Sequence, residues 1–142
     1  MTYIIEHIKN TYAKLDKNTV EGPLLGELYA DDILFVDPLH KIETLPNLKI
    51  YFTGMYKNVT DIHFNFDETM ANENTAFLSW TMDFRHPKLN GGKLIRVPGT
   101  TRILHNGVKI TFHQDYFDST HMIFDHIPLL KTIIRTIKNR LN

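Results

Sequence analysis

The chain has 142 residues, of which 42% are hydrophobic and 23% charged, so one globular domain with its own core is expected. Its formal net charge is zero, which leaves no global field to attract nucleic acid. It contains no cysteine, which excludes disulfides, thiol nucleophiles and cysteine metal sites, and which fits a reducing cytoplasm.

The N-terminal residues predict helices. Residues 1–15 lack the apolar core of a signal peptide, and no apolar run reaches the length of a transmembrane helix. Asn18 or Thr19 is a candidate N-cap for a second helix, which would contain Leu24, Leu25 and Leu28. The first helix is expected to end near Asp16, because apolar side chains recur at helical spacing up to that point: Ile4, Ile5, Ile8, Tyr12 and Leu15.

A buried strand is predicted at residues 33–36, and it ends at Asp37, which Pro38 follows. Asp37 would therefore lie where a core strand opens outward. Poor solvation at the mouth of an apolar pocket makes a carboxylate a candidate acid or base. The alternative is a carboxylate that caps a turn or pairs with a surface cation. Residues 38–43 indicate a loop, and Thr44 is a candidate N-cap for a third helix ending at residues 57–58.

From residue 62 the apolar period changes from helical spacing to alternation, which is typical of strands. Four strands are predicted, near residues 62–67, 76–85, 93–105 and 109–117. The third has a predicted break at Pro98–Gly99, and Asn106–Gly107 indicates a tight hairpin turn. One face of the second strand is a candidate ligand wall, although sheet core is the commoner role for each of its residues taken separately: Trp80, Met82 and Phe84.

This order of elements predicts an α+β fold, in which a cone-shaped, curved antiparallel sheet wraps around three N-terminal helices. The wide end of such a cone can hold a small molecule. Residues 1–120 form this domain in our interpretation, and residues 121–142 form a C-terminal basic amphipathic helical extension of it. The isoleucine stripe of that helix is expected to pack onto the domain. The alternative is contact with an anionic membrane surface, because residues 128–141 carry four basic side chains and no acidic one.

Four segments together resemble the nuclear transport factor 2-like superfamily. They are residues 29–38, the helix with Tyr51 and Phe52, the strand with Trp80, and residues 107–118. The superfamily includes ketosteroid isomerases, SnoaL-like polyketide cyclases and limonene epoxide hydrolases. The resemblance covers roughly residues 3–118. It implies the cone fold, a pocket for a small apolar ligand without a cofactor, and a homodimer formed through the convex face of the sheet. Unrelated activities occur on this fold, so the resemblance specifies the fold better than the reaction.

The resemblance to ketosteroid isomerases assigns roles to three residues. Their proton-shuttling base falls on Asp37. Their oxyanion tyrosine on the first helix is matched by Tyr12, with a difference of one residue in length. Their second oxyanion donor is a protonated aspartate, whose position here is held by Thr101. A threonine donates a hydrogen bond but lacks the acidity of a carboxylic acid.

The resemblance to SnoaL-like cyclases lies in the last strand, where His113 and Asp115 match their histidine–aspartate pair. Alternation places both side chains on the same face, where they can act as a proton relay. The alternative is an ion pair on the outer face of the sheet. Epoxide hydrolases of this fold use an arginine–aspartate pair on one strand, which is missing around Arg102.

The sequence thus predicts a protein that binds an apolar organic molecule and transfers a proton next to a carbonyl, as an isomerase or cyclase does. Asp37 or Asp115 would remove the proton, and His113 or Tyr12 would support the oxyanion. A non-catalytic ligand-binding or dimeric interaction domain is the alternative. No metal site is expected, because the eight histidines form no His-Glu-x-x-His pattern. The expected ligand contacts are Trp80, Met82, Phe84, Tyr51 and Thr101.

Overall fold

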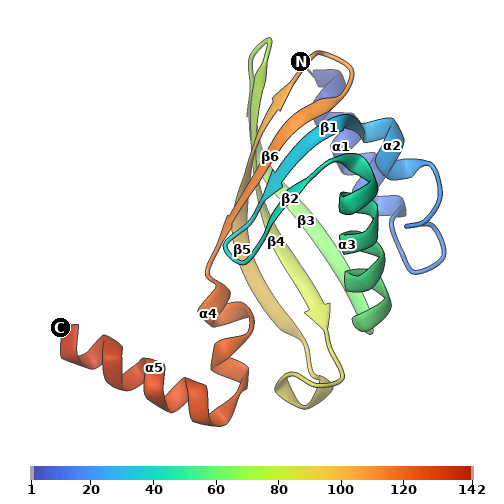
Figure 1. Cartoon of the computed structure of the whole chain (residues 1–142). Helices are drawn as coiled ribbons and strands as arrows, with labels where there is room; N and C mark the ends of the chain where they lie inside the picture. Colours follow the sequence, from blue (N-terminus) through green and yellow to red (C-terminus); the bar gives the residue numbers. More distant parts are fainter. Residues whose placement is uncertain (1, 142) are drawn as a thin grey trace.

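The computed structural model describes residues 2–141, which fold into one six-stranded curved sheet with helices on its concave side (Figure 1). The strand order is β2-β1-β6-β5-β4-β3, so β2 and β3 are open edges and the sheet is not closed. The predicted α+β cone is confirmed. The strands are β1 (Tyr29–Val36), β2 (Lys41–Glu43), β3 (Asp61–Ala71), β4 (Thr75–Arg85), β5 (Ile95–His105) and β6 (Ile110–Phe117).

The helices gather in two places. Three N-terminal helices cover the concave face, and the C-terminal ones follow the last strand (Figure 1). They are α1 (Thr2–Lys14), α2 (Leu24–Leu28), α3 (Leu45–Asn58), α4 (Ser119–Met122) and α5 (Pro128–Leu141), with short 3-10 turns η1 (Asn90–Gly92) and η2 (Phe124–His126). Antiparallel pairing dominates the sheet, but β1 runs parallel to β6.

The core lies between α1, α3 and the inner face of the sheet. Alternation along β4 decides which side chains enter it, since the even-numbered residues are buried: Ala76, Leu78, Trp80, Met82 and Phe84. The inward face of β6 carries His113 and Asp115, whereas Phe112 lies under the Arg102 guanidinium on the outer face. The predicted outer-face alternative for the histidine–aspartate pair is therefore wrong.

The second helix begins at Leu24 rather than at Asn18 or Thr19. Residues 16–22 instead form a turn, in which Asp16 Oδ1 accepts hydrogen bonds from the backbone N–H groups of Asn18 and Thr19. The Thr19 hydroxyl donates to the carbonyl of Lys14 at 2.7 Å, so it ends α1 instead of starting α2. Asp and Thr side chains compete with helices in this way.

The loop predicted at residues 38–43 is wrong in its second half. Residues 41–43 form the short edge strand β2, which pairs with β1, because the turn at Asp37 folds the chain back on itself. Thr44 is the N-cap residue of α3, as predicted, and its carbonyl accepts from the backbone N–H of Leu48, but its side chain makes no capping hydrogen bond. Its φ of 75° is unusual for a β-branched residue, and its backbone N–H donates to the carbonyl of Ile33.

The predicted break at Pro98–Gly99 is absent, because β5 is continuous from Ile95 to His105. Pairing with β6 ends at Gly99, opposite Phe117, so Pro98 lies just beyond it. Gly99 instead allows the indole ring of Trp80 to pack directly against the backbone of β5. It pairs with Trp80 across the sheet, and a Cβ atom at Gly99 would overlap the indole ring.

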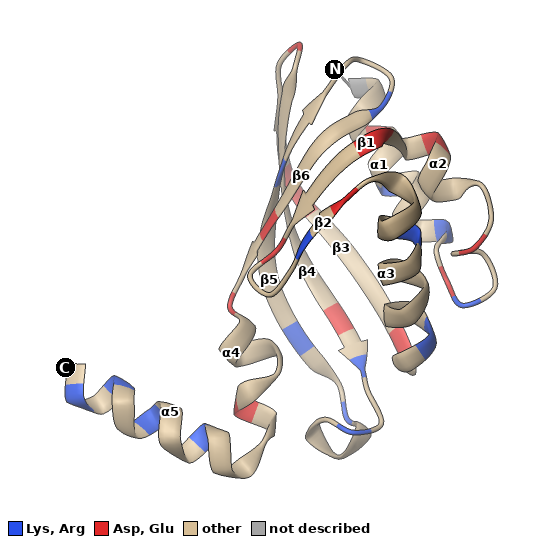
Figure 2. Ribbon diagram, viewed as in Figure 1, with Lys and Arg blue, Asp and Glu red and all other residues tan. Residues whose placement is uncertain are grey.

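The isoleucine stripe of α5 does not pack onto the domain as predicted. The helix extends away from the sheet after α4 and η2 (Figure 1), and none of its side chains is buried. Its basic residues are spaced along its length (Figure 2). Among residues 2–141, no helix is long and apolar enough to span a membrane.

Candidate functional site

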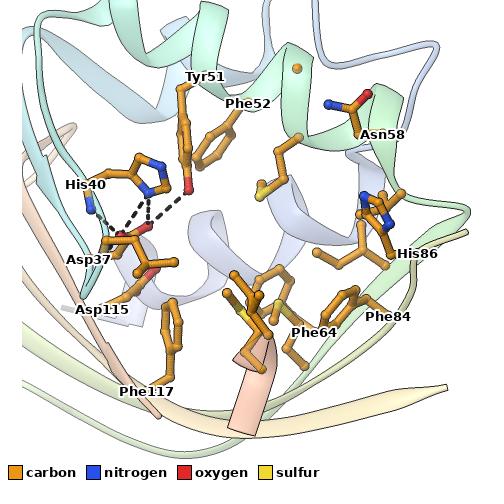
Figure 3. Close-up of a pocket in the computed structure, with 18 of the residues that line it drawn as sticks. Asp37, His40, Tyr51, Phe52, Asn58, Phe64, Phe84, His86, Asp115 and Phe117 are labelled. Carbon is orange, nitrogen blue, oxygen red and sulfur yellow. Dashed lines mark hydrogen bonds and ion pairs between the residues drawn. The ribbon is translucent and has the colours of Figure 1, made fainter. Parts of the chain in front are cut away.

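A cavity of about 600 Å³ lies between α3 and the inner face of β3, β4 and β6 (Figure 3). Its wall is largely aromatic and aliphatic, and Met122 and Ile123 from the α4 end border it. Four of the five predicted ligand contacts line this cavity, namely Trp80, Met82, Phe84 and Tyr51. The fifth, Thr101, is buried behind the wall. Such a cavity suits a largely apolar organic molecule.

Asp37 lies at the edge of the cavity, where β1 ends, and its side chain is only 6% exposed. Protein donors surround it instead of water. Oδ1 accepts the backbone N–H groups of Leu39 and His40, both at 2.8 Å, and contacts His40 Nδ1 at 3.1 Å. The Tyr51 hydroxyl donates to Oδ2 at 3.0 Å (Figure 3). Asp37 therefore both caps a turn and faces the cavity.

Asp115 borders the same edge of the cavity. The parallel register pairs Phe35 with His113 and Val36 with Gln114, which places Asp37 beside Asp115. Asp115 Oδ1 contacts His113 Nε2 at 2.7 Å and accepts from the Thr101 hydroxyl at 2.5 Å. Within residues 2–141 the other oxygen, Oδ2, has no hydrogen-bond partner. The two neighbouring carboxylates thus differ, because both oxygens of Asp37 are engaged and one of Asp115 is not.

A hydrogen-bonded relay continues inward from Asp115. His113 is buried, its ring stacks on Phe35 at 4.5 Å, and its Nδ1 lies 3.0 Å from the Tyr29 hydroxyl. The Tyr29 hydroxyl in turn lies 2.8 Å from the Tyr12 hydroxyl. Tyr12 also lines the cavity, so the relay leaves the cavity at Asp115 and returns to it at Tyr12.

A second hydrogen-bonded path leads from Asp115 through Thr101 to Trp80. Trp80 Nε1 donates to Thr101 Oγ1 at 2.8 Å, so the Thr101 hydroxyl must direct its own proton to Asp115. Thr101 thereby occupies the predicted donor position but donates to a carboxylate, not to a ligand. His113 likewise has both ring nitrogens engaged and does not border the cavity.

When Asp115 is a carboxylate, it sets which atom donates in each hydrogen bond of the relay. A carboxylate only accepts, so His113 Nε2 carries a proton and, in the neutral ring, Nδ1 accepts from Tyr29. Tyr29 then accepts from Tyr12. The Tyr12–Tyr29 hydrogen bond can also run in the opposite direction. When Tyr29 donates to Tyr12, the Tyr12 O–H is free to point into the cavity.

Two residues of the site were not predicted, Tyr29 and His40. Tyr29 has the same parity as the buried Ile33 and Phe35, but Asp31 between them is exposed and the pairing of β1 with β6 shifts register there, so alternation alone does not identify Tyr29. His40 lies three residues after Asp37, and its position depends on the turn. The sequence carries no comparable signal for it.

Four tyrosines of this region resist ionisation. Burial raises the pKa of Tyr12, Tyr29 and Tyr56, and burial followed by the Asp37 carboxylate raises the pKa of Tyr51. These phenols stay neutral in the folded protein at a pH where an unfolded tyrosine, with a pKa of about 10, loses its proton.

Stability is therefore expected to fall as the pH rises above about 10, because the unfolded chain then binds fewer protons than the folded one. The slope is about 1.4 kcal/mol per pH unit for each buried tyrosine. Urea unfolding between about pH 9 and pH 11 measures it. Tyr29→Phe should make the decline shallower, whereas a stability that stays constant over this range would contradict the assignment.

No group of three or more histidine, aspartate or glutamate side chains within residues 2–141 is placed to hold a metal ion.

Comparison with known proteins places the chain in a family. The sequence profile of the SnoaL-like domain matches residues 9–113. No curated protein matches the chain. Many solved structures share the fold, and the three described here do so at identities too low to transfer a function. A provisionally assigned SnoaL-like polyketide cyclase of Shewanella putrefaciens is 18% identical with a TM-score of 0.71, and the match covers 91% of this chain and 98% of that one.

The other two structures were determined with small molecules. A hypothetical protein of Catenulispora acidiphila with a ketosteroid isomerase-like fold, in complex with trimethylamine, is 15% identical with a TM-score of 0.72, covering 87% of this chain and 90% of that one. TerC, co-crystallised with polyporic acid, is 16% identical with a TM-score of 0.69, covering 84% and 94%.

Proposed function

Because this chain belongs to the SnoaL-like domain family, we propose that its cavity binds a small, largely apolar organic molecule and transfers a proton at a carbon next to a carbonyl. The observation that carries the proposal is the pair of neighbouring carboxylates, Asp37 and Asp115, at the edge of an apolar cavity. Within the described residues neither carboxylate pairs with an arginine or lysine. Asp37 meets His40 and Tyr51, and Asp115 meets His113 and Thr101.

Asp115 is the general base in this proposal. Its Oδ1 is held by His113 and Thr101, which leaves Oδ2 to accept a proton from the ligand carbon. Asp37 is less suited to this role, because donors already engage both of its oxygens. His113 acts as a positioning residue, since it orients the carboxylate through Nε2 and does not border the cavity.

Tyr12 is the donor that supports the developing oxyanion. Tyr12 lines the cavity, and its ring packs edge-on against Phe64 with the ring centroids 5.2 Å apart, which fixes its position. Either hydroxyl can donate in the Tyr12–Tyr29 hydrogen bond, and when Tyr29 donates, the Tyr12 O–H can point to the ligand. The aromatic wall keeps water from the reacting atoms.

Deuterium exchange tests the proposal directly. A panel of apolar β,γ-unsaturated ketones and cyclisable polyketide analogues is incubated with the protein in D₂O, and deuterium uptake next to the carbonyl is followed by NMR. Exchange faster than in buffer, on at least one member of the panel, is expected. Ligand binding without any exchange across the panel would support the alternative, a non-catalytic ligand-binding domain.

We also propose that two copies pair through the outer face of the sheet, and that the protein works in the cytoplasm. The support for pairing is an apolar surface on β3–β6, where Met70, Phe77 and Tyr116 are exposed. Phe77→Glu is expected to halve the mass seen by sedimentation, whereas Val108→Glu, at the exposed β5–β6 turn, is expected to leave it unchanged. A monomeric wild-type protein would contradict the pairing.

A further inference from the structure

The apolar side of α5 has no partner within the described chain. Ile137 is 53% exposed and Leu141 82% exposed, and Ile133 is exposed as well. An isolated helix of 14 residues with an apolar stripe is marginally stable in water unless another surface covers that stripe. The stripe follows helical spacing along the whole helix: Leu130, Ile133, Ile134, Ile137 and Leu141.

Charge is segregated between α5 and the rest of the chain. All sixteen acidic residues lie within residues 1–127, together with twelve of the sixteen basic ones, so this part carries a net charge of −4. The remaining four basic residues all lie in α5 (Figure 2). On a helical projection, Lys131, Arg135 and Lys138 lie along one side of the apolar stripe and Arg140 lies on the other. This arrangement fits a surface that is apolar inside and negatively charged at its rim.

The loop between β4 and β5 extends the same surface. It carries Lys88 and Lys93, and Leu94 is 39% exposed. The His121 ring of α4 contacts the carbonyl of Arg96 at 2.8 Å, which ties the base of the C-terminal extension to the start of β5. Figure 2 shows the basic residues of this loop and of α5 at the same end of the molecule.

We propose that α5 binds the anionic surface of a lipid bilayer. Its isoleucine stripe enters the headgroup region, its basic side chains contact lipid phosphates, and the loop with Lys88 and Lys93 faces the same surface. A second copy of the chain fits α5 less well. The outer sheet face, the other exposed apolar surface, carries Arg102 over Phe112, while its acidic residues Asp61 and Asp83 are already paired with Arg85 and Arg96.

This contact would also place the cavity next to the bilayer. Met122 and Ile123 border the cavity, and α5 begins only five residues later. If the proposed function holds, the ligand is then an apolar molecule that partitions into the membrane and enters the cavity from that side. The membrane contact itself does not depend on catalysis.

Vesicle flotation of the whole protein tests the contact. At low salt, the wild type is expected to float with vesicles of two parts phosphatidylcholine to one part phosphatidylserine, and about tenfold less with phosphatidylcholine alone. Added salt should weaken the binding. The double substitution Ile133→Gln and Ile137→Gln should reduce flotation about tenfold. The matched change on the polar side of α5, Thr132→Gln and Thr136→Gln, should not.

Three results would overturn the proposal. The wild type could stay unbound with anionic vesicles, or the isoleucine variant could float as well as the wild type. A sedimentation mass that drops in the isoleucine variant would assign the stripe to a second copy of the chain.

The orientation is tested by single cysteines, which this cysteine-free chain makes specific. A polarity-sensitive dye on Lys88→Cys should shift to the blue on anionic vesicles, and one on Glu73→Cys, at the far end of the sheet, should not. The reverse pattern would overturn the orientation. Failure of deuterium exchange would leave both vesicle results standing, so the two proposals fail separately.

Discussion

Replacement of Asp115 by asparagine is expected to lower the deuterium-exchange rate by about 10²–10⁴-fold, the usual contribution of a general base. Asparagine has the same shape, and its carbonyl oxygen can still accept from His113 and Thr101. The fold and the affinity for a substrate analogue should therefore persist while the proton acceptor is lost. Exchange kinetics, together with the dissociation constant of the analogue, measure both effects.

Asp37→Asn is the matched control, because it changes the neighbouring carboxylate in the same way. Its effect on exchange should be much smaller, since Asp37 is held by a turn and by Tyr51 and offers no unengaged oxygen. The opposite ranking, with Asp37→Asn inactive and Asp115→Asn active, would transfer the role of base to Asp37.

Gly99→Ala is expected to lower the free energy of unfolding by roughly 2–4 kcal/mol. The added methyl group would overlap the six-membered ring of Trp80, which is itself buried against the sheet. If the indole moves, Trp80 Nε1 loses Thr101 and the support of Asp115 weakens. Urea unfolding followed by tryptophan fluorescence measures the change, because Trp80 is the single tryptophan.

Gly54→Ala provides the control for that experiment. Gly54 lies within α3, and a Cβ there would meet no atom within 4 Å. Stability should stay constant or rise by about 0.5–1 kcal/mol, because glycine is unfavourable inside a helix. An equal loss in both variants would show that the Trp80 contact is not the cause.

Alternation was sufficient to predict much of the site. It placed Trp80, Met82 and Phe84 on one face of β4, and His113 with Asp115 on one face of β6, because side chains along a strand alternate between two faces. Which face is concave depends on the curvature of the whole sheet, so the sequence left that open. The relay through Tyr29 was missed for a related reason, because its partners lie 17 and 84 residues away in the chain.

Local signals were less reliable where tertiary contacts compete with them. Proline and glycine at residues 98–99 usually indicate a broken strand. Here Pro98 lies beyond the last residue that pairs with β6, and Gly99 leaves room for the indole ring of Trp80. Thr19 and Thr44 both resemble helix caps. One ends the preceding helix, and the other adopts a positive φ with its side chain uninvolved. The exposed stripe of α5 was likewise invisible, because amphipathic spacing does not specify the partner.

The parallel pairing of β1 with β6 has a consequence for how the chain acquires its structure. The first strand to be synthesised, with the buried residues Ile33 and Phe35, finds its inner neighbour only when the last strand appears. Contacts of such large sequence separation form late and slow the search for the native topology. Until then β1 lacks its β6 neighbour and the core around the N-terminal helices is incomplete. The emerging chain therefore exposes an apolar strand edge, which is the kind of surface that chaperones bind.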